Sequence, residues 1–145
     1  MKMVSEILKS ITLSLVLITV MSCENSHKTG RIQPTGPVTM NLYYTGTNGN
    51  ARKFVEEMES SGTADAIRAE QGNLRYDYFF SAADPETVLL IDSWKDQASI
   101  DAHHATPMMD KIIELRNKYN LHMSVERYIE DTAGIPDKYK NFIKE

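Results

Sequence analysis

The sequence has one cysteine, Cys23, among its 145 residues. A lone thiol provides neither an intrachain disulfide nor a sulfur-rich metal site, so packing must hold the fold. The remaining residues assemble no metal-ligand cluster, Gly-rich phosphate loop or Ser-His-Asp arrangement. The formal net charge is −4, with 20 acidic and 16 basic residues. This balance excludes the basic footprint of a nucleic-acid-binding protein.

Apolar runs of membrane-spanning length are also missing from the N-terminal region. Ile11–Met21 is apolar over eleven residues, whereas crossing about 30 Å of hydrocarbon takes roughly 20. Lys2 and Lys9 precede this run, and the order Val20-Met21-Ser22-Cys23 fits a lipobox. We therefore predict that residues 1–22 are a cleaved lipoprotein signal peptide and that Cys23 becomes the acylated N-terminus. The alternative is a stray cysteine behind an ordinary secretion signal.

This prediction places the protein in a bacterial cell envelope, on the periplasmic or surface side, with only its lipid in the membrane. Residues 23–37 are polar, contain two prolines and two glycines, and are predicted to be a flexible tether. Residues 38–131 are the predicted domain. Residues 132–145 form a C-terminal extension whose apolar side chains can dock on a partner subunit or on the domain's own edge; they are Ile135, Tyr139, Phe142 and Ile143.

Residue periodicity predicts the elements of the domain. Alternating apolar and polar residues predict strands at 38–45, 74–80, 87–94 and 121–128. Helical spacing over 54–67, interrupted by Ser60-Ser61-Gly62, predicts one broken helix or two short ones. Two further helical pieces are expected, one capped by Asp96 and one over Pro107–Lys118 capped by Thr106. This order predicts an α+β, ferredoxin-like βαββαβ fold, an antiparallel sheet with helices on one face.

The other face of this sheet is predicted to be too apolar to remain in water. We therefore expect a homodimer that covers it. The residues predicted on this open face are Asn41, Tyr43, Phe79, Leu89, Ile91 and Tyr128.

The most specific motif runs from Trp94 to Pro107: a tryptophan that ends a strand, a polar turn, a short helix with Ala102-His103, and Thr106-Pro107 before the next helix. Glu70-Gln-Gly72-Asn-Leu-Arg-Tyr76 and Asp84-Pro85 are weaker signals. In these motifs, residues 38–131 resemble the antibiotic biosynthesis monooxygenase superfamily, small dimeric α/β barrels that include quinol monooxygenases. The sequence departs from the family at Met108, where many members have histidine. Its second helix also lacks the axial histidine of the haem-degrading branch.

The resemblance implies a monooxygenase without flavin, metal or other cofactor, in which a deprotonated quinol or similar dihydroxy-aromatic reduces O2 directly. It implies that His103 is the base and that Asn41 and Trp94 donate hydrogen bonds to the anion. Each of these three residues also has a purely structural interpretation. His103 can be a structural histidine, Asn41 a strand residue on an exposed face, and Trp94 a core tryptophan. His104, about 100° around the helix from His103, is expected at the surface. The residues expected to bind substrate are Tyr44, Tyr76, Met108 and Met109.

A second interpretation belongs to another class of protein. It is a non-catalytic, lipid-anchored dimer that binds a small apolar ligand. Met108 favours this alternative, because it leaves the pocket with one acid–base group fewer than a second histidine would.

Overall fold

The computed structural model describes residues 36–131 and 133–143. The predicted signal peptide, Cys23 and most of the predicted tether lie outside these residues. The described elements are β1 (Val38–Thr45), α1 (Asn50–Ser60), α2 (Thr63–Arg68), β2 (Asn73–Phe80), β3 (Thr87–Trp94), α3 (Gln97–His104), α4 (Met108–Lys118), β4 (His122–Ile129) and the 3-10 helix η1 (Asp137–Phe142). Each strand begins and ends within one residue of its predicted bounds.

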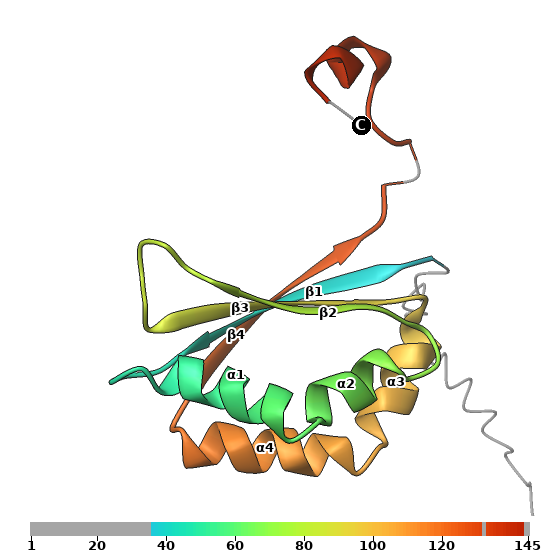
Figure 1. Ribbon diagram of the computed structural model, residues 1–145. Coiled ribbons are helices and arrows are strands. Elements are labelled where there is room, and N and C mark those ends of the chain that lie inside the picture. Colours follow the sequence, from blue (N-terminus) through green and yellow to red (C-terminus); the bar gives the residue numbers. More distant parts are fainter. Residues whose placement is uncertain (1–35, 132, 144–145) are drawn as a thin grey trace, which may run out of the picture. The chain divides into compact units, whose positions relative to one another are not determined.

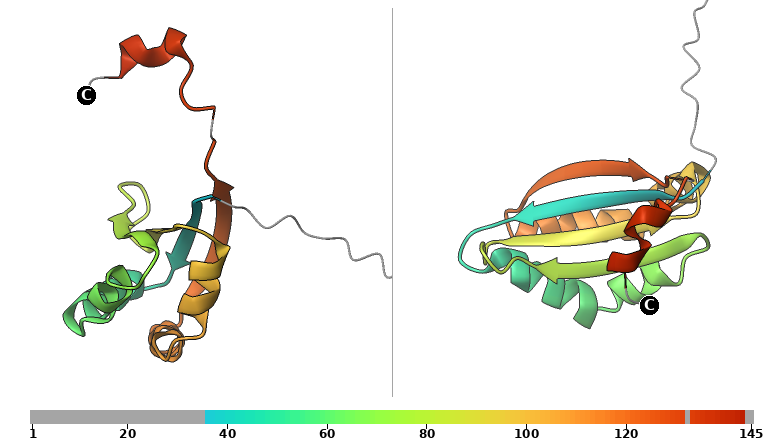
Figure 2. Two further views of the ribbon diagram at one scale, coloured as in Figure 1. Left: turned by 90° about the vertical axis from the view of Figure 1, so that its right-hand side faces the viewer. Right: turned by 90° about the horizontal axis from the view of Figure 1, so that it is seen from above.

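The strands form one sheet in the order β2-β3-β1-β4. Every neighbouring pair is antiparallel, and β1 lies between β3 and β4. The helices α1 to α4 cover one face of this sheet and leave the other face open (Figure 1, Figure 2). The predicted α+β, ferredoxin-like βαββαβ fold is therefore confirmed. No helix among the described residues combines the length and the apolar character that a membrane span requires.

Local chemistry explains where the helices begin and end. Gly62 has a left-handed backbone with φ of 75°, so the first helical region is two helices, α1 and α2. Asp96 caps α3 as predicted, because its side chain accepts a hydrogen bond of 2.8 Å from the Ser99 amide. The predicted cap of α4 is wrong. The Thr106 hydroxyl instead donates to the His103 carbonyl oxygen at 2.7 Å, which satisfies the end of α3, and Pro107 takes the cap position.

The hydrophobic core lies between the sheet and the helices. Successive strand residues point to opposite faces, so every second residue of β1 and β3 contributes to it. Fully burying an aliphatic or aromatic side chain of this kind contributes about 1.5–3 kcal/mol. The largest fully buried side chains are Trp94, Phe54, Met58, Ile67, Leu90, Leu115, Val38 and Val88.

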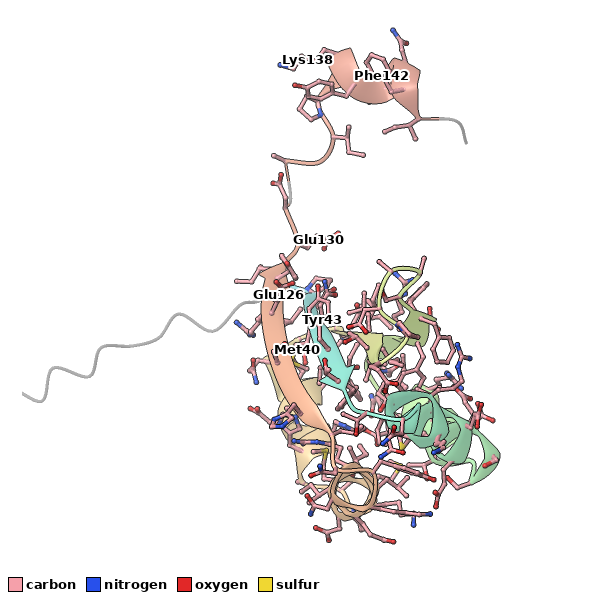
Figure 3. All side chains as sticks on the ribbon, turned by 90° about the vertical axis from the view of Figure 1, so that its left-hand side faces the viewer. Met40, Tyr43, Glu126, Glu130, Lys138 and Phe142 are labelled. Carbon is pink, nitrogen blue, oxygen red and sulfur yellow. The ribbon has the colours of Figure 1, made fainter. Side chains whose placement is uncertain are left out.

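The open face is as apolar as predicted. Strand pairing places Asn41 opposite Ile91, Tyr43 opposite Leu89, and Phe79 opposite Leu89. Phe79 and Tyr128 are 41% and 50% exposed. The Tyr43 hydroxyl donates a 3.0 Å hydrogen bond to Glu126 of β4; Figure 3 labels both side chains. The apolar side chains of the C-terminal extension are exposed as well.

Candidate active site

A cavity of about 210 Å³ lies between the helix-covered face of the sheet and the helices α3 and α4. Its wall is mostly apolar, with a few titratable groups from different elements. Such concave sites with few polar groups are typical of small-molecule binding. The lining residues are Met40, Leu42 and Tyr44 of β1, Tyr76 of β2, Leu90 and Asp92 of β3, Met123 and Val125 of β4, His103 and His104 of α3, and Met109, Ile112 and Arg116 of α4.

His103 is the buried base of this wall, with 4% of its surface exposed. Its Nδ1 lies 3.1 Å and 3.0 Å from the two carboxylate oxygens of Glu70. An ionised carboxylate only accepts hydrogen bonds, so Nδ1 carries the proton and donates it. Nε2 is then the unprotonated nitrogen of the neutral ring and the one available to a ligand. His103 is therefore oriented and set in one tautomer as a general base requires.

Glu70 reaches His103 from the turn between α2 and β2. Two residues later, Gly72 has φ of +92°, and a Cβ there would meet the Ser99 hydroxyl oxygen at 2.2 Å. The turn therefore requires glycine. Glu70 also lines a separate surface hollow of about 460 Å³ with Gly72 and Ser99. The carboxylate thus lies between His103 and the solvent-facing surface.

Trp94 packs behind His103 and not on the cavity wall. Its ring centroid lies 4.9 Å from that of His103, with the planes tilted by 30°. The side chain is fully buried. The indole Nε1 has no hydrogen-bond partner among the described residues. In this chain the expected direct hydrogen bond from Trp94 to substrate has no geometric basis, because β3 ends there and its last side chain points into the core.

Asp92 is a carboxyl group on the cavity wall that the sequence interpretation missed. It is 4% exposed, and its Oδ1 has no partner among the described residues. Burial raises the pKa of Asp92 to about 6, and the negative charge of Glu70 raises it further. Asp92 can therefore exchange protons close to neutral pH. Asp92 pairs with Met40 and takes a core-facing position of an apolar strand. An acidic residue at such a position is the sequence signal that could have indicated it.

The other end of the cavity has a phenol and a guanidinium. Tyr44 is 2% exposed, and burial raises its pKa to about 12, while the charge of Arg116 lowers it. The Arg116 Nε is buried and has no partner among the described residues. Met109, Ile112 and Arg116 follow each other at helical spacings of three and four, which explains why α4 presents them on one face.

Asn41 lies on the opposite face of the sheet from the cavity. Met40 and Leu42 line the cavity, so the period of the strand turns Asn41 toward the open face. There it lines a hollow of about 710 Å³ with Ile91 and Tyr128. A single chain therefore does not bring Asn41 and His103 together, and the expectation that they share one site is wrong for the single chain.

Some of the residues expected to bind substrate line the cavity and others do not. Tyr44, Tyr76 and Met109 line the cavity, whereas Met108 packs against the core beside it. One residue along a helix is a rotation of about 100°, which turns Met108 away. His104 is exposed as expected but also forms part of the wall. Among the residues that the structure describes, no group of three His, Cys, Asp or Glu side chains is placed to bind a metal ion.

These features are those of a ferredoxin-like α+β domain with a small, mostly apolar cavity under its sheet. The chain belongs to the antibiotic biosynthesis monooxygenase family, because the model of the family described as "Antibiotic biosynthesis monooxygenase" matches residues 37–115. YcnE of Bacillus subtilis (strain 168) is 33% identical over 54 residues. This match covers 37% of the chain and 55% of YcnE, so it spans about half the length of that relative.

Solved structures are similar in fold. A conserved protein from Methanosarcina mazei Go1 superposes with a TM-score of 0.59 at 16% identity, covering 67% of this chain and 95% of that one. SnoaB, a cofactor-independent oxygenase from Streptomyces nogalater, superposes with a TM-score of 0.57 at 14% identity, covering 66% and 93%. At these identities the similarity establishes the fold alone.

Proposed function

We propose that the protein is a cofactor-independent monooxygenase that oxidises a quinol or similar dihydroxy-aromatic with O2. The observation that carries this proposal is His103, a buried base on the wall of an apolar cavity, oriented by Glu70 at 3.0 Å. Membership of the antibiotic biosynthesis monooxygenase family supports the reaction type. A quinol is the substrate that the family resemblance implies, and a base against an apolar wall suits an aromatic hydroxyl group.

In the proposed reaction, Nε2 of His103 accepts the proton of a substrate hydroxyl. The resulting phenolate is electron-rich and transfers electrons to O2. One oxygen atom enters the ring and the other leaves as water, so one quinol and one O2 give one hydroxyquinone and one water. All four electrons come from the ring, and no external reductant is needed. The apolar wall keeps bulk water from the anion, which strengthens its interactions with nearby donors.

Oxygen uptake tests this proposal. The purified protein is given a panel of quinols in an oxygen electrode, and the uncatalysed oxidation rate is subtracted. We expect at least one quinol to consume one O2 per molecule and to give a hydroxyquinone without hydrogen peroxide. His103→Gln should lose this activity, and His122→Gln, an exposed histidine on β4, should keep it. Uptake no faster than the uncatalysed rate for the whole panel would overturn the proposal.

The alternative function is a non-catalytic module that binds a small apolar ligand. The observation favouring it is that, of the three expected catalytic residues, only His103 lines the cavity. Trp94 stacks on His103, so its fluorescence should change when the cavity is filled. Ligand-dependent quenching without oxygen uptake would support this alternative over the oxygenase.

We further propose, from the sequence, that the Cys23 lipid holds the protein in the cell envelope and that the open sheet face forms a homodimer. The exposed apolar residues on that face support the second part.

A further inference from the structure

Arg116 is a cation without a counter-ion on the cavity wall. Its guanidinium forms no ion pair with any carboxylate of the described residues. Its Nε is buried and has no hydrogen-bond partner there. An arginine side chain is charged at every pH at which proteins fold, and a buried donor without an acceptor is costly. Arg116 is half-buried, and its buried Nε can donate to an oxygen acceptor in the cavity.

Arg116 lies at the opposite end of the cavity from the base. Asp92 pairs with Met40 at one end of β1, and Tyr44 lies four residues further along that strand. At about 3.3 Å per residue, these two positions are about 13 Å apart. The charge of Glu70, the partner of His103, acts on Asp92, and the charges of Arg116 and Asp92 both act on Tyr44. His103 and Asp92 thus form one polar end, and Arg116 and Tyr44 form the other.

The wall between the two ends is apolar. Apart from Tyr76 and His104, the rest of the lining is aliphatic or methionine and includes Leu42, Leu90, Ile112 and Val125. The cavity volume is about 210 Å³, which leaves room for one aromatic ring with a short side chain.

We infer that the substrate is a single-ring hydroxyarene whose short side chain ends in a carboxylate, with its ring hydroxyl at His103 and its carboxylate at Arg116. Guanidinium matches carboxylate geometry better than any other cationic side chain. Tyr44 also lines the cavity, and a tyrosine hydroxyl can donate a further hydrogen bond. The hydroxyl groups of the inferred substrate rest on the proposed function. Its carboxylate is inferred from Arg116 alone.

Binding measured without O2 tests the inference. The probes are (2,5-dihydroxyphenyl)acetate and the neutral amide of the same size, (2,5-dihydroxyphenyl)acetamide, titrated anaerobically by calorimetry into the full-length protein. We expect the acid to bind at least tenfold more tightly than the amide, since a hydrogen bond between a guanidinium and a carboxylate is stronger than one to a neutral amide. Arg116→Gln should remove this preference, because the affinity for the acid falls more than the affinity for the amide.

Arg52→Gln is the matched control, because Arg52 is exposed on α1 and stacks on Phe80, remote from the cavity wall. It should retain the preference. Arg116→Lys keeps the charge but loses the fork of donors, so it should bind the acid with intermediate affinity. If Arg116→Gln fails to fold, Arg116→Lys replaces it as the test.

Two outcomes would overturn the inference: equal affinities for acid and amide in the wild type, or an unchanged preference in Arg116→Gln. These outcomes differ from failure of the proposed function. Selective binding of the acid without oxygen uptake would overturn only the oxygenase. Oxidation of acid and amide with equal kcat/KM would overturn only the carboxylate specificity.

Discussion

The carboxylate of Glu70 lies 3.0 Å from Nδ1 of His103, and the two residues are 33 positions apart in the chain. The bond fixes the proton on Nδ1 and makes Nε2 the acceptor. It also connects a ring on the cavity wall to a carboxylate that lines a surface hollow. A histidine of α3 and a carboxylate from the turn after α2 are thus joined by one hydrogen bond.

Glu70→Gln tests this orientation. A glutamine amide can donate as well as accept, so His103 can adopt the wrong tautomer. We expect kcat/KM for an active quinol to fall by roughly 10- to 10⁴-fold, with a changed pH–rate profile. Glu56→Gln, on the exposed side of α1, should behave as wild type. Unchanged kcat/KM and pH profile in Glu70→Gln would reduce the pair to a structural contact.

His103→Gln tests the base itself. Glutamine keeps hydrogen-bonding capacity and much of the volume but cannot act as a base. We expect turnover to fall by about 10²–10⁴. Tm should shift by no more than about 4–8 °C, the effect of about 1 kcal/mol in a domain of this size. Normal turnover would remove His103 as the base, whereas a collapsed Tm with residual activity intact would assign it a structural role.

Asp92 makes stability depend on pH in a defined direction. Its pKa of about 6 in the folded protein lies above the ordinary value of 3.8, so the folded state binds the proton more tightly than the unfolded state. The stabilisation is present below about pH 3.8 and is lost as pH rises through 6. Two pKa units correspond to about 3 kcal/mol at most.

Urea unfolding of wild type and Asp92→Asn between pH 4 and pH 7.5 measures this effect. Asparagine is never charged, so contributions from the other carboxylates cancel in the difference between the two proteins. We expect the variant to gain about 1–3 kcal/mol relative to wild type as pH rises from 4 to 7.5. If the difference in unfolding free energy between the two proteins does not change with pH, burial does not raise the pKa of Asp92.

Much of the fold could be predicted because it depends on local periodicity. Alternation in β1 indicated its two faces, and Gly62 marked the break between α1 and α2. The same alternation argued against Asn41 as a partner of His103, since Met40 and Leu42 face the cavity. The family resemblance implied that Asn41 donates a hydrogen bond to the substrate anion beside His103. The alternation of β1 instead places Asn41 on the face opposite the cavity in the single chain.

The polar groups of the site were harder to predict, because they depend on contacts that are distant in sequence. Glu70 belongs to a motif that the sequence shows, but its bond to His103 requires the turn of Glu70 and Gly72 to lie against α3. Asp92 follows four apolar residues, so the sequence suggests that the buried part of the strand ends before it. Arg116 could have been found from its spacing with Met109 and Ile112, which places a charge on the apolar face of α4.

The lipid anchor remains a prediction about residues outside the described range. Growth with labelled fatty acid should label the wild-type protein, because Cys23 follows Val20-Met21-Ser22 at the expected cleavage position. Cys23→Ala should carry no label. Equal labelling of both proteins would contradict acylation at this residue.

The open face predicts the oligomeric state. A standard interface buries about 1,600 Å² in total, and the apolar side chains on this face give a dimer a surface to bury. We expect protein without residues 1–37 to be a homodimer at micromolar concentration by light scattering. Ile91→Asp should give a monomer, because a two-fold interface repeats each substitution on both subunits and would bury both carboxylates.

Lys111→Asp is the control for this change. Lys111 lies on α4, on the helix-covered side of the sheet, so the new charge is remote from the open face and the dimer should persist. Circular dichroism must show that Ile91→Asp keeps its secondary structure, since a monomer that has unfolded says nothing of the interface. A wild-type monomer at micromolar concentration, or a folded Ile91→Asp dimer, would place the interface elsewhere, and the exposed apolar residues of the C-terminal extension would then be the next surface to mutate.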